Sequence, residues 1–234
     1  MTSASAIADN ARRFRDDFES ECARLGLNPN DITIVAVSKT FTAEAIAAAF
    51  AAGFTNFGEN KVQEAKEKIP AIALAPKPTW HMIGHLQSNK AKDAVALFDL
   101  IQSVDSWHLA DELNRRAAAF GKRQDVLIQV NTSGEEQKSG CDPWDVDELV
   151  GDVAALESLR LLGVMTIGPL TDDEEEIAAA FRDLRGIFDR LRAADLRGGQ
   201  MRYCSMGMTD DWTIALAEGS NMLRIGRAIF GERA

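Results

Sequence analysis

The sequence predicts an α/β protein, a single (β/α)8 barrel with an extra helix before the first strand, and three observations favour this fold class. Eight short β-rich segments alternate with helical segments along the chain. The first of them, residues 32–39, is almost entirely apolar, which is typical of a parallel strand buried on both faces. The length of 234 residues is close to the usual length of about 250 residues for this fold.

A doubly wound open sheet is the alternative, because it also alternates strands and helices. The sequence has no GxGxxG motif after its first strand, which disfavours that class. No linker or low-complexity stretch interrupts the chain, so we expect residues 1–234 to form a single domain.

The first 25 residues predict a helix, because apolar residues recur there at a spacing of three or four. These residues are Ile7, Ala11, Phe14, Phe18, Cys22 and Leu25. Gly26 ends this helix, and residues 28–31 form a turn before the first strand.

The strands are predicted from short β-branched or apolar runs, each bounded by turn residues. They cover residues 32–39, 56–60, 79–84, 99–105, 125–131, 160–166, 202–206 and 221–226.

The helices between the strands begin and end at recognisable residues. Thr42 caps the first of them, which runs to Ala52 and stops at Gly53. The next three helices end at Ile69, Leu97 and Phe120.

Two later helices have clear start signals. Asp142 and Pro143 supply a cap and a first-turn proline. Residues 171–174 read Thr-Asp-Asp-Glu, a capping box for a long helix that ends near Ala193. The last expected helix covers residues 209–218.

Composition excludes several classes of protein. The chain has 26 Lys and Arg against 36 Asp and Glu, a net charge of −10, which disfavours nucleic acid as the main partner. No apolar stretch approaches the roughly 18 residues that a membrane span needs, and no apolar segment follows the N-terminal arginines as in a secretory signal. Cys22, Cys141 and Cys204 are odd in number and lack metal-type spacing, so we expect a reducing, cytoplasmic location.

In a barrel of this kind the functional site forms at the carboxyl ends of the strands. The polar residues at these ends are Lys39, Asn60, His81, Asp105, Asn131, Thr166, Ser205 and Arg224.

Lys39 is the most informative of these residues. It ends an apolar strand, and it shares a face with Val35 and Val37 by the two-residue period. If that face points inward, burial disfavours the ammonium, and a neutral lysine amine is the nucleophile that Schiff-base chemistry needs. The alternative is a strand-end lysine whose charge reaches water.

The loops after the last two strands predict a phosphate site. Residues 205–209 contain a serine and a glycine, and residues 224–228 contain a second glycine. Asp210 and Asp211, in an expected first helical turn, would compete with a phosphate there, so we place it against Ser205 and the backbone of Gly226 and Arg227. The alternative is two ordinary glycine turns. Taken with Lys39, a phosphate site suggests pyridoxal 5′-phosphate (PLP).

Other candidates have simpler explanations. His81 and His85 are four residues apart, but no third ligand has matching spacing, so we expect no metal. Glu59 either faces the mouth of the barrel or pairs with a nearby cation. Cys204 alternates with Ser205 and should point away from the barrel axis as a packing thiol.

Several sequence blocks closely resemble the YggS/PROSC family, the pyridoxal phosphate homeostasis proteins. The resemblance follows chain order over nearly the whole length. It is carried by residues 36–40, 57–64, 80–90, 126–131, 138–140, 163–165, 205–211 and 224–231.

The resemblance implies a barrel like the N-terminal domain of alanine racemase, with PLP bound covalently as a Schiff base on Lys39. It implies further cofactor contacts at Asn60, Ser205, Gly207, Arg224, Gly226 and Arg227. Arg227 departs from the family pattern, in which a Thr or Ser commonly follows the glycine that is Gly226 here. The expected phosphate site therefore loses a side-chain hydroxyl and gains a cation. The family is regarded as non-enzymatic. We accordingly expect a monomeric PLP carrier, with PLP-dependent apo-enzymes as recipients and no nucleic-acid or membrane partner.

The residue chemistry favours a carrier over a catalyst. The resemblance implies that Arg224 lies beside the pyridine nitrogen. An arginine does not give up its proton, so that nitrogen would stay unprotonated and the ring would be a poor electron sink. Racemisation also needs a second acid or base on the opposite face. Tyr203, the only tyrosine, shares strand parity with Ser205 and should lie deeper in the barrel. The alternatives are a PLP-dependent amino-acid racemase and a Schiff-base aldolase.

Overall fold

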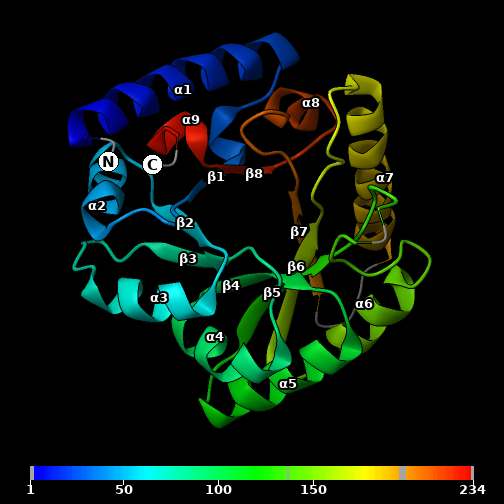
Figure 1. Cartoon of the computed structure of the whole chain (residues 1–234). Coiled ribbons are helices and arrows are strands. Elements are labelled where there is room, and N and C mark those ends of the chain that lie inside the picture. The colour runs from blue at the N-terminus through cyan, green and yellow to red at the C-terminus, as the bar shows by residue number, and fades with distance from the viewer. Residues whose placement is uncertain (1–2, 136, 195–198, 233–234) are drawn as a thin grey trace.

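The strands close into a parallel barrel in chain order, with β8 hydrogen-bonded back to β1 (Figure 1). This is the arrangement in a computed structural model that describes residues 3–135, 137–194 and 199–232. The strands are β1 (Thr33–Val37), β2 (Asn56–Glu59), β3 (Thr79–Met82), β4 (Leu100–Val104), β5 (Gln124–Gln129), β6 (Leu159–Met165), β7 (Gly199–Ser205) and β8 (Met222–Ile225). The predicted (β/α)8 barrel is confirmed.

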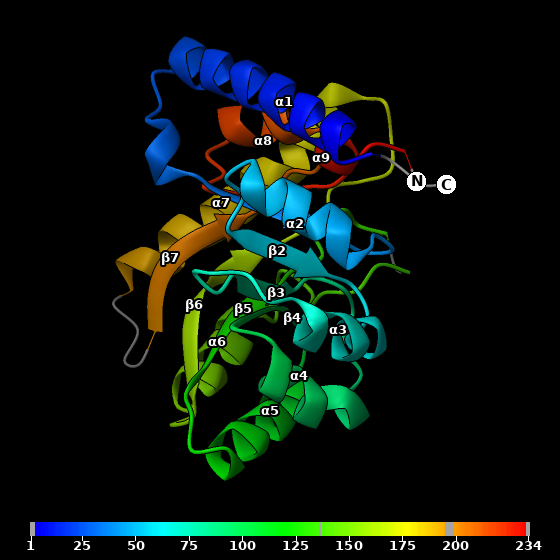
Figure 2. The same cartoon turned by 90° about the vertical axis from the view of Figure 1, so that its left-hand side faces the viewer.

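Helices surround the barrel (Figures 1 and 2). They are α1 (Ala4–Leu25), α2 (Ala43–Ala51), α3 (Val62–Lys68), α4 (Ala91–Leu97), α5 (Trp107–Ala119), α6 (Val146–Ala154), α7 (Glu174–Ala193), α8 (Trp212–Ala217) and α9 (Arg227–Phe230). Three short 3-10 helices, η1 (Pro29–Asp31), η2 (Ile69–Ala71) and η3 (Ser88–Lys90), lie between them. Within these described residues, no helix is long and apolar enough to cross a membrane.

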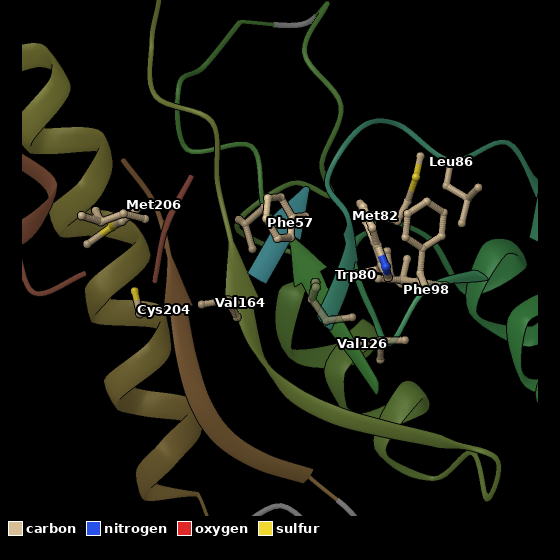
Figure 3. Close-up of a cluster of buried hydrophobic side chains, with 14 of the residues drawn as sticks. Phe57, Trp80, Met82, Leu86, Phe98, Val126, Val164, Cys204 and Met206 are labelled. Carbon is tan, nitrogen blue, oxygen red and sulfur yellow. The ribbon is translucent and has the colours of Figure 1, made fainter. Parts of the chain in front are cut away.

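The alternation of side chains along each strand divides the core into two layers. Inside the barrel lies a small cluster of apolar residues: Val35, Leu100, Leu127, Leu162, Met165 and Met222. The outward-facing residues pack against the helices in a much larger cluster, part of which is drawn in Figure 3. Cys204 belongs to that outer layer beside Val164 and Met206, as expected, and its burial raises the pKa of the thiol to about 12.

The predicted N-terminal helix is confirmed, and its position has a physical reason. The element that follows β8, α9, has only four residues and is too short to cover the adjoining strands. Helix α1 lies across this part of the barrel and packs on α2, α8 and α9 (Figures 1 and 2). Phe14 of α1 makes an edge-on contact with Trp212 of α8 at 5.6 Å between ring centroids. Gly26 ends α1 in the left-handed conformation, at φ 69°.

Some predicted helix starts are wrong. Residues 142–145 form a turn, in which the Asp142 carboxylate accepts a hydrogen bond from the Trp144 amide, and α6 begins at Val146. Asp173, not Thr171, caps α7, because its carboxylate accepts the amides of Glu175 and Glu176. Helix α8 begins at Trp212, three residues after the predicted start. In each case a side chain bonded to a nearby amide holds a turn that competes with the first helical turn.

Candidate functional site

The carboxyl ends of β1 and β8 bring three of the expected site residues together. These strands are neighbours, with Val35 opposite Arg224 and Ala36 opposite Ile225. A Cβ atom added to Gly226 would lie 3.7 Å from Cβ of Val37, so this register continues to the strand ends. The half-buried Lys39, two residues after Val37, therefore adjoins the Gly226 segment at the rim of the barrel.

The backbone on both sides of Lys39 is held by a cluster of charged side chains, formed by Glu59, Glu64 and Lys68. The Lys68 ammonium donates to the Ser38 carbonyl at 3.0 Å, to Glu59 at 2.9 Å and to Glu64 at 2.5 Å. The Ser38 hydroxyl donates to Glu59 at 2.7 Å. Glu59 is fully buried, and burial raises the pKa of its carboxyl. Of the two alternatives for Glu59, the structure shows the pairing with a cation.

The residue after Lys39 is held in a strained conformation by the same cluster. Thr40 has φ 67°, in the left-handed region that β-branched residues rarely adopt. Its amide donates to the Glu64 carboxylate at 2.6 Å. Strained backbone of this kind persists where the surroundings fix it, which makes the position of Lys39 well defined.

Arg224 is a buried cation beneath the mouth of the barrel. Its side chain donates to the Ser205 hydroxyl at 2.7 Å and to the Thr166 carbonyl at 2.6 Å, both neutral acceptors. Burial lowers the pKa of the guanidinium to about 10, while the charge of Asp211 partly offsets that effect. At neutral pH Arg224 is therefore charged, and its five N–H groups exceed the two hydrogen bonds described.

The loop between β7 and α8 lies against the end of β8. The Gly207 carbonyl accepts the Arg224 amide at 3.0 Å. Gly207 has φ 94°, and a Cβ atom there would lie 2.6 Å from Cβ of Ala215, so this position requires glycine. The Thr209 hydroxyl accepts the Gly226 amide at 3.2 Å, which joins this loop to the segment after β8.

Asp210 and Asp211 precede α8 instead of occupying its first turn, which corrects the expectation from the sequence. Asp210 forms an ion pair with Arg227, and Glu232 approaches the same guanidinium at 3.8 Å. Asp211 is buried, accepts the Met208 amide, and has its pKa raised by burial. Both carboxylates are thus engaged, so they compete with a bound anion less than the sequence suggested.

Ser205 is the last residue of β7, at the strand end where it was expected, but its hydroxyl already has two partners. It is fully buried, accepts a hydrogen bond from Arg224 and donates its one hydrogen to Gln102 Oε1 at 2.7 Å. A phosphate needs a donor, and in this arrangement the Ser205 hydroxyl has none to give. The hydroxyl beside Gly226 is that of Thr209. Sequence reasoning missed Thr209, although it lies within the block 205–211.

His81 and His85, the two histidines considered as metal ligands, differ in burial and in their partners. His81 is buried inside the barrel, 3.0 Å from Gln102 and 3.1 Å from Asn56, and burial lowers its pKa to about 3. His81 therefore lies below the mouth, contrary to its placement among the strand-end residues. His85 is exposed and lies 3.6 Å from Asp105. Among the residues that the structure describes, no group of three or more His, Cys, Asp or Glu side chains could hold a metal ion.

Asn60 and Tyr203 lie at opposite ends of the barrel. Asn60 is half-buried directly after β2, where Gly84 approaches its backbone so closely that a Cβ atom would lie 2.4 Å from the Asn60 carbonyl oxygen. Tyr203 lines a pocket at the amino ends of the strands, together with Asn56 and Thr79. It lies deeper than Ser205, as its strand parity indicated.

The fold and site define a class: a parallel barrel with a lysine directly after β1 and a buried arginine on the adjacent β8. The donors suit an anionic ligand with a carbonyl group, because an amine, a guanidinium, a hydroxyl and glycine backbone adjoin one rim.

Comparison with known proteins identifies the family. The pattern of the alanine racemase N-terminal domain family matches residues 3–234. The pyridoxal phosphate homeostasis protein of Pasteurella multocida is 44% identical over 228 residues, which are 97% of each chain. The chain belongs to this family, among the pyridoxal phosphate homeostasis proteins.

Solved structures agree with this assignment. The structure of PipY from Synechococcus elongatus PCC7942 with PLP bound superposes with a TM-score of 0.83 at 37% identity, covering 96% of this chain and all of that one. Alanine racemase from Clostridium difficile 630 has a TM-score of 0.73 at 19% identity, and the match covers 96% of this chain but 57% of the racemase. That second likeness shows a shared fold.

Proposed function

We propose that this chain binds PLP covalently through Lys39, as a Schiff base, and takes part in PLP homeostasis without catalytic turnover. The observation that carries the proposal is that Lys39 follows the carboxyl end of β1, while the buried Arg224 lies on the adjacent β8, where it is opposite Val35. The relatives named as pyridoxal phosphate homeostasis proteins and the PLP-bound PipY support it. We propose that residues 1–234 act as one PLP-binding domain.

PLP supplies an aldehyde that condenses with a lysine amine. The other residues of the site would bind the pyridine ring and the phosphate of PLP. Arg224 would donate to the pyridine nitrogen, and the Thr209 hydroxyl and the Arg227 amide would donate to the phosphate. The Gly226 amide donates to Thr209 in this structure and would turn to the phosphate when the ligand binds. Asn60 lies at the same rim and remains a proposed contact. We assign Ser205 and Gly207 to supporting Arg224 and the loop, respectively.

The absence of turnover is proposed on the chemistry of Arg224 and Tyr203. Arg224 keeps its proton near neutral pH, so it would donate to the ring nitrogen without protonating it. Tyr203 lines the pocket at the opposite end of the barrel and is therefore unsuited as a second acid or base at the mouth. Transfer of PLP to apo-enzymes, a monomeric state and a cytoplasmic location belong to the same proposal.

Borohydride reduction of the PLP-loaded protein, followed by peptide mass mapping, tests the cofactor and its lysine together. We expect the reduced adduct on Lys39, and we expect Lys39→Ala to fold but lose the adduct and the visible absorbance. Lys61→Ala is the matched control, because Lys61 is an exposed lysine next to Asn60. An adduct on Lys61 or Lys90 in the wild type would contradict the assignment.

Exchange of the alanine Cα hydrogen for deuterium at saturating PLP tests the absence of turnover. We expect exchange far below the range of enzymes, whose turnover is typically about 10 per second. Enzyme-like exchange by the wild type would instead support the racemase alternative.

A further inference from the structure

A series of hydrogen bonds, buried except at its part-buried Asn56 end, crosses the inside of the barrel from Arg224 to the opposite end. Arg224 donates to Ser205 at 2.7 Å, and Ser205 donates to Gln102 at 2.7 Å. Gln102 Nε2 lies 3.0 Å from Nδ1 of His81, and His81 Nε2 lies 3.1 Å from Oδ1 of Asn56. The five residues come from β8, β7, β4, β3 and β2.

The direction of every hydrogen bond in this series follows from Arg224. A guanidinium only donates, so Ser205 accepts from it and must give its single hydrogen to the Gln102 carbonyl oxygen. The Gln102 amide nitrogen then faces His81, whose Nδ1 must be the acceptor.

The far end of the series is consistent with this direction. His81 with an acceptor at Nδ1 carries its hydrogen on Nε2 and donates to the Asn56 carbonyl oxygen. Burial lowers the pKa of His81 to about 3, so the ring is neutral and has one donor and one acceptor. A protonated ring would place a hydrogen on Nδ1, against the Gln102 amide.

These hydrogen-bonded side chains share the barrel interior with an apolar cluster that includes Val35, Leu127 and Leu162. Gln102 and Ser205 are fully buried, and His81 is 2% exposed. Apolar residues would fill this space without the desolvation of three polar groups, so packing alone does not account for them.

We propose that Gln102 and His81 are positioning residues for Arg224, which they act on through Ser205. They hold the Ser205 hydroxyl with its hydrogen turned away from Arg224, and so they set the orientation in which the guanidinium meets the ring nitrogen of PLP. This inference rests on the proposed function, because it assigns these residues to the ligand of the same site.

The test in the ligand-free protein is the protonation of the His81 ring, read by 15N NMR. We expect hydrogen on Nε2 alone in the wild type. In Gln102→Glu the carboxylate accepts from both neighbours, so we expect hydrogen to appear on Nδ1 of His81. A wild-type ring with hydrogen on Nδ1, or a ring unchanged in Gln102→Glu, would overturn the proposed series of hydrogen bonds.

The test in the loaded protein compares PLP with 1-deaza-PLP, in which carbon replaces the ring nitrogen. We expect Gln102→Leu to weaken PLP binding about tenfold, the effect of losing one well-oriented hydrogen bond, and to leave 1-deaza-PLP within about twofold. Equal loss of both ligands, or loss of neither, would overturn the positioning role, since a purely structural defect does not distinguish them.

Two controls keep the outcomes separate. Gln124→Leu removes another fully buried glutamine, whose amide donates to the Asp99 carbonyl at 3.0 Å and has no part in the series of hydrogen bonds from Arg224 to Asn56. We expect that variant and the wild type to bind PLP equally. Failure of the wild type to bind PLP would overturn the proposed function itself. A correct His81 protonation pattern with no selectivity between the ligands would overturn this inference alone.

Discussion

Ser205 ends β7 and Thr209 lies in the loop that follows it, yet the partners of their hydroxyl groups differ. Thr209 contacts the Gly226 amide, whereas Ser205 is occupied by Arg224 and Gln102. We expect Thr209→Val to weaken PLP binding by roughly ten- to a hundredfold and pyridoxal binding little, because a hydrogen bond to a charged group contributes about 1.5–3 kcal/mol. Titration with both ligands measures the difference.

Ser205→Ala is the matched variant for this comparison. We expect it to weaken PLP and pyridoxal by similar factors, because it acts through Arg224 and the ring that both ligands share. A selective loss of PLP in Ser205→Ala, with Thr209→Val unaffected, would return the phosphate contact to Ser205.

Lys68 is a second residue whose role depends on its partners. It neutralises the fully buried Glu59 and holds the Ser38 carbonyl beside Lys39. We expect Lys68→Met to lower the free energy of unfolding by about 3–5 kcal/mol, the usual effect of leaving a buried charge without its partner. Urea unfolding at neutral pH measures it, and PLP should load more slowly onto the variant.

Lys66→Met supplies the control, since Lys66 lies on the same helix and pairs with Asp93 at the surface. We expect its effect to be within about 1 kcal/mol. The double variant Glu59→Gln with Lys68→Met should recover part of the lost stability, because no buried charge is left. Equal stability of the two single lysine variants would refute the role given to the cluster.

At the scale of elements, helix α1 covers the part of the barrel beside the short helix α9. Phe14 is 4% exposed and contacts both Phe18 and Trp212. We expect Phe14→Ala to lower the free energy of unfolding by about 3–5 kcal/mol, through lost burial and the cavity that remains. Urea unfolding followed by circular dichroism measures this loss.

Phe120→Ala is the comparison, because Phe120 follows α5 and is 48% exposed. We expect a much smaller loss, below about 1 kcal/mol. A similar loss in both variants would mean that α1 is not an integral part of the barrel.

For the whole molecule, the buried His81 makes stability depend on pH. Its pKa is about 3 in the folded chain and near the ordinary 6.5 when unfolded, so between these values the unfolded chain binds more protons. Stability therefore falls as pH decreases through this range, by up to about 1.4 kcal/mol per pH unit from this group. Glu59 and Asp211, with raised pKa values, contribute in the opposite direction.

His81→Gln should remove this part of the pH dependence, and urea unfolding at several pH values between 6.5 and 4 measures the slope. The contributions of Glu59 and Asp211 are common to both proteins and cancel in the comparison. His85→Gln serves as the control, because His85 is exposed. A slope unchanged by His81→Gln would show that the ring is accessible to protons in the folded chain.

The eight strands, helix α1 and the Lys39 position were predictable because they depend on local patterns. A buried parallel strand appears in the sequence as an apolar run, and α1 appears as apolar residues spaced three or four positions apart. Each can therefore be recognised without knowing which elements pack against it. The starts of α6, α7 and α8 were less predictable. They depend on which of several adjacent Asp or Thr side chains bonds which amide, and these alternatives differ little in energy.

By itself, the sequence determined the barrel, its N-terminal helix and the group of proteins to which the chain belongs, because strand order and motif blocks are read along one chain. Only the tertiary structure decided the partners of each polar side chain. Ser205 and Gln102 lie 103 positions apart and form a buried hydrogen bond, and Glu59 lies 9 residues from Lys68 and forms a part-buried one. A buried polar group is hydrogen-bonded to whichever partner the closed barrel places beside it. The separation of two residues in the sequence does not indicate how far apart they lie in space.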